Sequence, residues 1–231
     1  MQIAIGRSRL IELLEAQVGN NFLLEDKERA AIHDTLDLAL ARTEKCFSPN
    51  KSKYFRRDGD LYFNPYHSAQ YCVFLYYFAN TLWRNGGAGF LCDKLYLLNK
   101  VLNALDLFYQ VEMPEVFFTE HPVGTVIGRA TYGSYFSFSQ GCTVGNNRDI
   151  YPVIGENVRM CSDSRIIGNC RIGNNVILAA GCFVKDTDVP DCTVVFGESP
   201  NLIFKRQEPD YFVRAILKDP VPVAVESEVG K

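Results

Sequence analysis

The stretch from Ile154 to Asp188 reads IGENVRMCSDSRIIGNCRIGNNVILAAGCFVKDTD, and an apolar residue occupies every sixth position in it. These positions are Ile154, Met160, Ile166, Ile172, Leu178 and Val184. Four residues after each of the first five comes a smaller or β-branched residue, namely Val158, Ser164, Cys170, Val176 and Cys182. A period of six fits neither a helix nor a plain strand. It is typical of a parallel β-helix with the spaced apolar residues inside, and an ordinary sheet with an accidental rhythm is the alternative.

The same rhythm continues toward the N-terminus in a second block. Its inward positions are Tyr132, Phe136, Phe138, Cys142 and Val144. Between Val144 and Ile154 the spacing is ten, so four extra residues leave the coil within residues 146–152. This segment is polar and carries charge and an aromatic ring. Because loops that project from a rigid solenoid commonly carry binding groups, we expect it to have a functional role.

The composition indicates a globular protein and excludes two classes. The 231 residues, 47% of them hydrophobic, can form one large domain or two small ones with a substantial core. A net charge of -3 without a long basic run argues against nucleic-acid binding. The longest apolar run, residues 71–83, is shorter than the roughly 20 residues that a membrane-spanning helix needs. We therefore expect no nucleic-acid partner and no membrane span.

The cysteines and the N-terminus bear on the cellular compartment. The chain has eight cysteines, none in a C-x-x-C pair, and three of them fill small inward positions of the predicted coil. The first residues show no charged lead followed by a long apolar segment, so no secretory signal is visible. These features favour a reduced, cytoplasmic protein.

The N-terminal half has a helical pattern. Amphipathic or apolar helices are predicted over residues 7–18, 25–46, 65–83 and 90–111. Residues 51–64, with an Asp58-Gly59 turn signal, are predicted to form an irregular connector, and residues 211–217 a short helix. The predicted domains are a helical N-terminal domain (1–113), a β-helix domain (114–205) and a loose C-terminal tail (206–231).

Three histidines are the candidates for acid-base chemistry. His33 follows an apolar residue in an amphipathic pattern and is expected at the surface or its boundary. His67 lies near a predicted helix start, which favours a capping or packing role, with a site wall as the alternative. His121 lies at the entrance to the coils, where spacing alone leaves a structural and a functional role equally open.

Two runs, HPVGTVIG (121–128) and QGCTVG (140–145), resemble the serine acetyltransferase branch of the hexapeptide-repeat acyltransferases. The resemblance covers about residues 65–205. It implies an α+β chain with a helical N-terminal domain followed by a left-handed parallel β-helix, assembled as a homotrimer. It also implies acetyl-CoA as co-substrate, a small-molecule acceptor, His121 as general base and Asp106, fifteen residues earlier, as its orienting partner. A neutral imidazole can take the proton of an attacking hydroxyl, and a carboxylate can fix its tautomer.

The remaining site residues follow from the same resemblance. Coenzyme contacts carry over to Ser162, Ala179, Ala180, Gly181 and Lys205, the last of these toward the nucleotide phosphates. On the acceptor side, Glu120 stands next to His121, and Ile150-Tyr151 replace an Arg-His pair that binds serine in the family. We therefore expect Arg148 to substitute for the lost cation, or Tyr151 to stack on a sugar.

Three functions remain open on the sequence. The first is serine O-acetyltransferase-like transfer to a hydroxyl, and the second is O- or N-acetylation of a sugar or nucleotide sugar in surface polysaccharide biosynthesis. The third is a β-helix protein without acyl transfer, such as a metal-dependent carbonic anhydrase or a scaffold. A metal site needs several histidines on the coils, where His121 stands alone, so no metal is expected.

Overall fold

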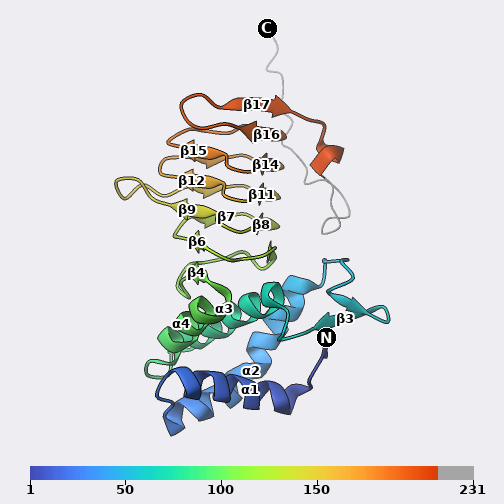
Figure 1. Cartoon of the computed structure of the whole chain (residues 1–231), viewed down its shortest axis with the longest axis vertical. Helices are drawn as coiled ribbons and strands as arrows, with labels where there is room; N and C mark the ends of the chain where they lie inside the picture. The colour runs from blue at the N-terminus through green and yellow to red at the C-terminus, as the bar shows by residue number, and fades with distance from the viewer. Residues whose placement is uncertain (213–231) are drawn as a thin grey trace.

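The computed structural model describes residues 1–212, in which a helical part is followed by a stack of short strands (Figure 1). The four helices are α1 (Arg7–Asn21), α2 (Asp26–Phe47), α3 (Ser68–Arg84) and α4 (Leu91–Asn103). The strands above them form a parallel β-solenoid of about five turns. The predicted order, helical part first and parallel β-helix second, is confirmed.

The predicted fourth helix ends earlier than its leucine pattern indicated. It stops at Asn103, because Ala104 adopts a left-handed conformation with φ 49°, and the chain continues as strand β4 (Leu105–Leu107). Leu105 and Leu107 are both buried, as expected for alternate residues of a strand. Leu105 also fits the helical spacing of the preceding leucines, so the spacing did not reveal the end of the helix. The prediction of a helix to residue 111 was therefore wrong.

The predicted irregular connector contains regular structure. Strands β2 (Arg56–Arg57) and β3 (Asp60–Phe63) form a hairpin across the expected Asp58-Gly59 turn. Strand β3 also pairs in parallel with β1 (Gln2–Ile3), which precedes α1 and is distant from β3 in sequence. This distant partner stabilises strands that the local sequence did not indicate.

Three sheets form the sides of the solenoid. The six-stranded sheet contains β5 (Phe117–Thr119), β8 (Phe136–Phe138), β11 (Val158–Met160), β14 (Val176–Leu178), β16 (Thr193–Phe196) and β17 (Ile203–Arg206). The five-stranded sheet contains β4, β6 (Thr125–Ile127), β9 (Thr143–Gly145), β12 (Arg165–Ile167) and β15 (Phe183–Lys185). The three-stranded sheet contains β7 (Thr131–Tyr132), β10 (Val153–Ile154) and β13 (Arg171–Ile172). All pairs are parallel except β16 with β17.

The register reproduces the sequence rhythm. Equivalent groups in neighbouring regular coils are 18 residues apart, as for Asn157 and Asn175, which corresponds to three six-residue units. Across the predicted insertion the separation is 22 residues, as for Cys142 and Ser164. The four additional residues form a loop that projects from the stack after β9 (Figure 1).

The inward positions form the core of the solenoid. All six residues of the period-six series are at most 3% exposed, and the small residues between them are equally buried. Cys142, Cys170 and Cys182 are buried free thiols, and burial raises the pKa of each. The apolar column therefore stabilises the coil by removing its side chains from water.

The structure also bears on the predicted domain limits and the C-terminal end. Strand β4 pairs with β6, so the solenoid sheet begins before the predicted division between residues 113 and 114. In the predicted tail, Arg206 ends β17 and a 3-10 helix spans Pro209–Phe212. The predicted helix over residues 211–217 lies mostly outside the described residues, as does most of the loose tail. Within residues 1–212, no helix is both long and apolar enough to cross a membrane.

A column of glycines allows the coils to stack closely at one set of corners. Gly133, Gly155 and Gly173 occupy equivalent positions after β7, β10 and β13. A Cβ atom on Gly155 would lie 2.8 Å from the backbone carbon and oxygen of Gly173. These backbone atoms cannot move without disturbing the sheet, so a side chain at this position forces the coils apart.

We predict that Gly155→Ala lowers the free energy of unfolding by about 1–3 kcal/mol, the usual cost of overpacking. Gly19→Ala is the matched control, because this glycine lies in α1 with nothing within 4 Å of its Cβ position. In a helix this change stabilises by about 0.5–1 kcal/mol. Urea unfolding of both variants at one protein concentration measures the difference, and equal stability would contradict the close approach.

Candidate active site

Most of the residues predicted for catalysis and coenzyme binding lie along one edge of the solenoid. This edge, here called the His121 edge, consists of the corners at residues 120–124, 139–142, 161–164 and 179–182, which lead from the six-stranded to the five-stranded sheet. Backbone hydrogen bonds stack the corners: Gly141 N donates to Val123 O (3.0 Å), Asp163 N to Gln140 O (2.9 Å) and Gly181 N to Ser162 O (2.9 Å). His121 therefore lies at the base of a column that continues upward through the predicted coenzyme residues.

The upper corners of the His121 edge carry small side chains. Ser162 and Ala179 are half-buried, whereas Ala180 and Gly181 are exposed. Gly181 has φ 71°, and nothing lies within 4 Å of the position of its missing Cβ. An extended ligand could therefore approach the backbone of this edge closely.

The side chain of Lys205 reaches toward the far end of the same edge. Its strand β17 pairs with β16, and its Nζ lies 5.1 Å from the centre of the Phe196 ring. Phe196 ends β16, whose Val195 carbonyl accepts a hydrogen bond from Ala179 N (2.9 Å). An exposed cation thus stands one coil above the small-residue corners, where it could meet an anionic group.

His121 is exposed and has a positive φ of 52°. The preceding Glu120 carboxylate lies 3.6 Å from the guanidinium of Arg159 on β11, so a carboxylate and a cation flank the histidine. His67, which directly precedes α3, is also a neighbour. Burial lowers the pKa of His67, a contact with its own backbone raises it, and His121 lowers it further. The His67 ring also lies 6.2 Å from Phe55, and Phe55 lies 6.4 Å from Phe118 of β5 (centre to centre), so the segment that carries His67 packs near the base of the edge.

Asp106 is held by helix α4. It lies in the middle of β4, where its Oδ1 accepts a hydrogen bond from Tyr96 Oη (2.6 Å) and its Oδ2 one from Lys100 Nζ (2.9 Å). Burial and the Asp106 carboxylate raise the pKa of Tyr96, and the hydrogen bond to Asp106 raises that of Lys100. Within residues 1–212, the structure gives Asp106 no hydrogen bond with His121, so their partnership stays a prediction.

Arg148 and Tyr151 lie on a different edge. Their loop connects the five-stranded to the three-stranded sheet. It is tied to the corner after β15, two coils further on, by Asn147 Nδ2, which donates to Asp186 Oδ2 (2.6 Å). Arg148 is exposed, and Tyr151 is 40% exposed. Within one chain the loop therefore does not join Glu120 and His121.

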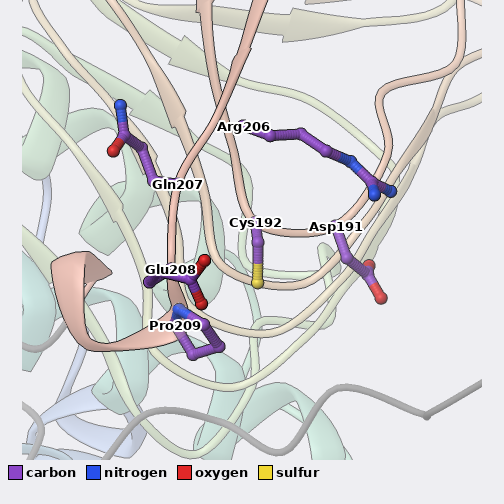
Figure 2. Close-up of a pocket in the computed structure, with 6 residues that line it drawn as sticks. All are labelled: Asp191, Cys192, Arg206, Gln207, Glu208 and Pro209. Atoms are coloured by element: carbon purple, nitrogen blue, oxygen red, sulfur yellow. The ribbon is translucent and has the colours of Figure 1, made fainter.

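A hollow of about 430 Å³ lies at the third edge and has no counterpart in the sequence predictions (Figure 2). Its lining residues are Asp191, Cys192, Arg206, Gln207, Glu208 and Pro209. Figure 2 shows the Asp191 and Arg206 side chains extending to the same side, with Cys192 and Glu208 beside them. None of the predicted site residues lines this hollow.

The described part of the chain contains no group of three or more histidine, cysteine or acidic residues arranged to hold a metal ion. The expectation that the protein works without a metal stays a prediction.

Comparisons with known proteins agree with the repeat and the fold. The family described as bacterial transferase hexapeptide (six repeats) matches residues 151–186. A serine acetyltransferase of Synechococcus elongatus is 34% identical over 104 residues, 42% of this chain and 42% of the relative. Serine acetyltransferase 2 of Arabidopsis thaliana is 32% identical over 155 residues, 65% of this chain and 46% of the relative. The chain thus spans about half the length of these relatives.

Solved structures extend the likeness to the helical part. Serine acetyltransferase from Brucella abortus superposes with a TM-score of 0.63 at 19% identity, covering 78% of this chain and 75% of that one. The Neisseria gonorrhoeae enzyme, solved in complex with serine, gives 0.61 at 22% identity and covers 81% of each chain. A serine acetyltransferase complex with CoA gives 0.63 at 17% identity, covering 85% and 83%. The predicted resemblance to the serine acetyltransferase branch is confirmed.

We predict that Asp106→Asn lowers the pKa of Tyr96 toward its ordinary value of about 10, because an amide no longer opposes the phenolate charge. Asp93→Asn is the control, since this carboxylate on α4 accepts from Tyr109 Oη (3.1 Å) and leaves Tyr96 unaffected. The measurement is a pH titration of the ring carbons in ¹³C-tyrosine-labelled protein, assigned with Tyr96→Phe. An unchanged Tyr96 titration would mean that Asp106 is not held by α4 in solution.

Proposed function

We propose that this chain is an acetyltransferase that moves the acetyl group of acetyl-CoA to a hydroxyl acceptor, with His121 as general base. The His121 edge carries the proposal, because an exposed histidine lies at the foot of a column of small corners and an exposed lysine at its top. Relatives named serine acetyltransferase, one of them solved with CoA, support the same activity.

The reaction needs a proton to move twice. His121 removes the proton of the acceptor hydroxyl as the oxygen attacks the thioester carbonyl, because a neutral imidazole can accept a proton from a positioned hydroxyl. The resulting imidazolium returns the proton to the departing thiolate as the carbon–sulfur bond breaks. The products are the acetyl ester and free CoA.

Asp106 is the proposed orienting partner of His121. Its strand β4 pairs with β6, which begins four residues after His121, so the two residues belong to adjacent coils. A carboxylate offers about four acceptor positions, so Asp106 can keep its bonds to Tyr96 and Lys100 and accept one more from an imidazole N–H. For this role the exposed His121 ring must turn toward β4.

The coenzyme is proposed to lie along the upper His121 edge. Ser162, Ala179, Ala180 and Gly181 allow its extended arm to approach the backbone, and Lys205 attracts its phosphates. Acetyl-CoA is a co-substrate in this proposal, and no step requires a metal.

Serine is the first candidate acceptor, because the relatives carry its name and one was solved with it. A sugar or nucleotide sugar is the second candidate. The exposed Ile150 and Tyr151 side chains favour it, since they offer an apolar surface rather than a cation for a carboxylate. We expect free serine to be a poorer acceptor than a hydroxylated or amino sugar.

A homotrimer in a cytoplasmic compartment completes the proposal. The loop that carries Arg148 and Tyr151 lies on a different edge of the chain from His121. A threefold assembly can place this loop of one copy against the His121 edge of the next. Each subunit boundary would then hold one site.

We predict that His121→Ala lowers kcat by about 10² to 10⁴, the usual contribution of a positioned base, and leaves coenzyme affinity near that of the parent. The rate is measured as thiol release from acetyl-CoA with a panel of hydroxyl acceptors. Asp106→Asn should also lower kcat in this assay. His33→Gln is the control, because this exposed histidine of α2 lies far along the chain from the edge. Parent activity in His121→Ala would assign the base to another group.

The trimer predicts complementation between inactive variants. Equal mixing of His121→Ala subunits with Arg148→Ala/Tyr151→Ala subunits, followed by refolding together, leaves about one quarter of the boundaries intact in random trimers. The mixture should therefore be more active than either variant alone. If the mixture is no more active than the two variants measured separately, sites shared between subunits are contradicted. A protein that binds the coenzyme but is a monomer by light scattering would contradict them as well.

A further inference from the structure

A group of aromatic rings lies where the helical part meets strand β5, which ends two residues before His121, and is not part of the proposed coenzyme path. We call it the aromatic wall, and it consists of Tyr54, Phe55, His67 and Phe118. The His67 ring lies 5.5 Å from Tyr54 and 6.2 Å from Phe55, and Phe55 lies 6.4 Å from Phe118 (centre to centre). Because Phe118 belongs to β5, which ends just before Glu120 and His121, the wall joins the helical part to the base of the His121 edge.

A buried glutamine fixes the wall. Gln70 is fully buried in α3, its Nε2 donates to the Tyr54 carbonyl (2.7 Å), and its Oε1 accepts from Asn64 N (2.6 Å). These bonds connect the segment before the β2–β3 hairpin with the segment that leads into His67. Tyr54 and His67 are therefore held next to each other by a core residue, and their proximity does not depend on surface contacts alone.

The imidazole of His67 has one nitrogen left for a ligand. Its Nδ1 is enclosed and has no hydrogen-bond partner among residues 1–212, and the side chain makes no capping bond to α3. Burial lowers the pKa of His67, which favours the neutral ring. A neutral imidazole carries an N–H on one nitrogen and a lone pair on the other, so Nε2 can take part in one hydrogen bond with a ligand in either tautomer.

The surroundings suit a neutral acceptor with one apolar face. Phe55 and Phe118 are buried, so Tyr54, which is 57% exposed, offers the open ring surface. The nearby charges are Lys53, whose Nζ lies 5.2 Å from the Tyr54 ring centre, and the Glu120–Arg159 pair, whose charges compensate each other. An aromatic surface beside a few hydrogen-bonding groups is typical of a small-molecule site.

We propose that the aromatic wall binds the acceptor and that the acceptor is a pyranose sugar. Its apolar ring face packs on Tyr54, and one of its hydroxyls forms a hydrogen bond with His67 Nε2. This leaves a neighbouring hydroxyl to face His121. Serine has no ring face for Tyr54. The inference rests on the proposed acetyl transfer, for which it names the acceptor class.

The test uses binding and turnover with the full-length protein. The probes are methyl β-D-glucopyranoside, methyl β-D-galactopyranoside, N-acetylglucosamine and L-serine, with binding followed by saturation-transfer NMR and turnover by thiol release from acetyl-CoA. At least one pyranoside should bind and be acetylated with a higher kcat/KM than serine. Tyr54→Ala and His67→Gln should each raise its KM about tenfold, as expected for one lost contact, with the KM for acetyl-CoA unchanged.

Matched variants separate the contact from general effects on folding. Tyr211→Ala removes a tyrosine of the same 57% exposure in the 3-10 helix beyond β17, and His33→Gln removes an exposed histidine of α2, so both should retain the parent KM. Tyr54→Phe keeps the ring and should restore the parent KM.

The outcomes for the two proposals are distinguishable. Turnover of serine without binding of any pyranoside would overturn the sugar inference and leave the acetyltransferase proposal intact. Equal KM values for the wall variants and their controls would also overturn it. Pyranoside binding that is lost in Tyr54→Ala, without acetyl transfer to any acceptor, would support the wall and end the acetyltransferase proposal.

Discussion

The structure depends on the requirement that each coil return to its starting corner with its backbone in register with the coil before. Parallel strands hydrogen-bond only if this return is accurate, and here it takes 18 residues, as between Val158 and Val176. The apolar column inside and the glycine corners outside both serve this return. The extra four residues after β9 do not disturb it, because they leave the stack and rejoin it at the same corner.

The sequence predicted the solenoid because its constraint is local and periodic. Met160 and Leu178 are buried since their positions in the six-residue unit determine which way they point. Prediction failed where a distant partner decides the structure. Strand β3 exists because it pairs with β1, and α4 ends at Asn103 because Leu105 joins the solenoid sheet through β6. Helical spacing alone could not distinguish these outcomes.

The same distinction applies to the site. His121 and the small residues above it were assigned from the family resemblance, and the regular repeat is what stacks their corners along one edge. The bonds of Asp106 to Tyr96 and Lys100 could not be found in the sequence, since they depend on how α4 packs against β4. The approach of His67 depends on Gln70, a buried polar residue within an apolar run that gave no functional signal. The hollow at Cys192 likewise forms only when the turn before β16 meets the segment after β17.

The reversal of the last strand has a consequence for assembly. β17 runs antiparallel to β16, and all four of its side chains are exposed, including those of Lys205 and Arg206. A further parallel coil cannot continue the ladder beyond it, and charged side chains on a terminal strand oppose addition of a foreign strand. The opposite end of the stack faces the helical part (Figure 1). The charged terminal strand at one end and the helical part at the other thus disfavour end-to-end addition of strands, which protects the solenoid from polymerisation into fibres.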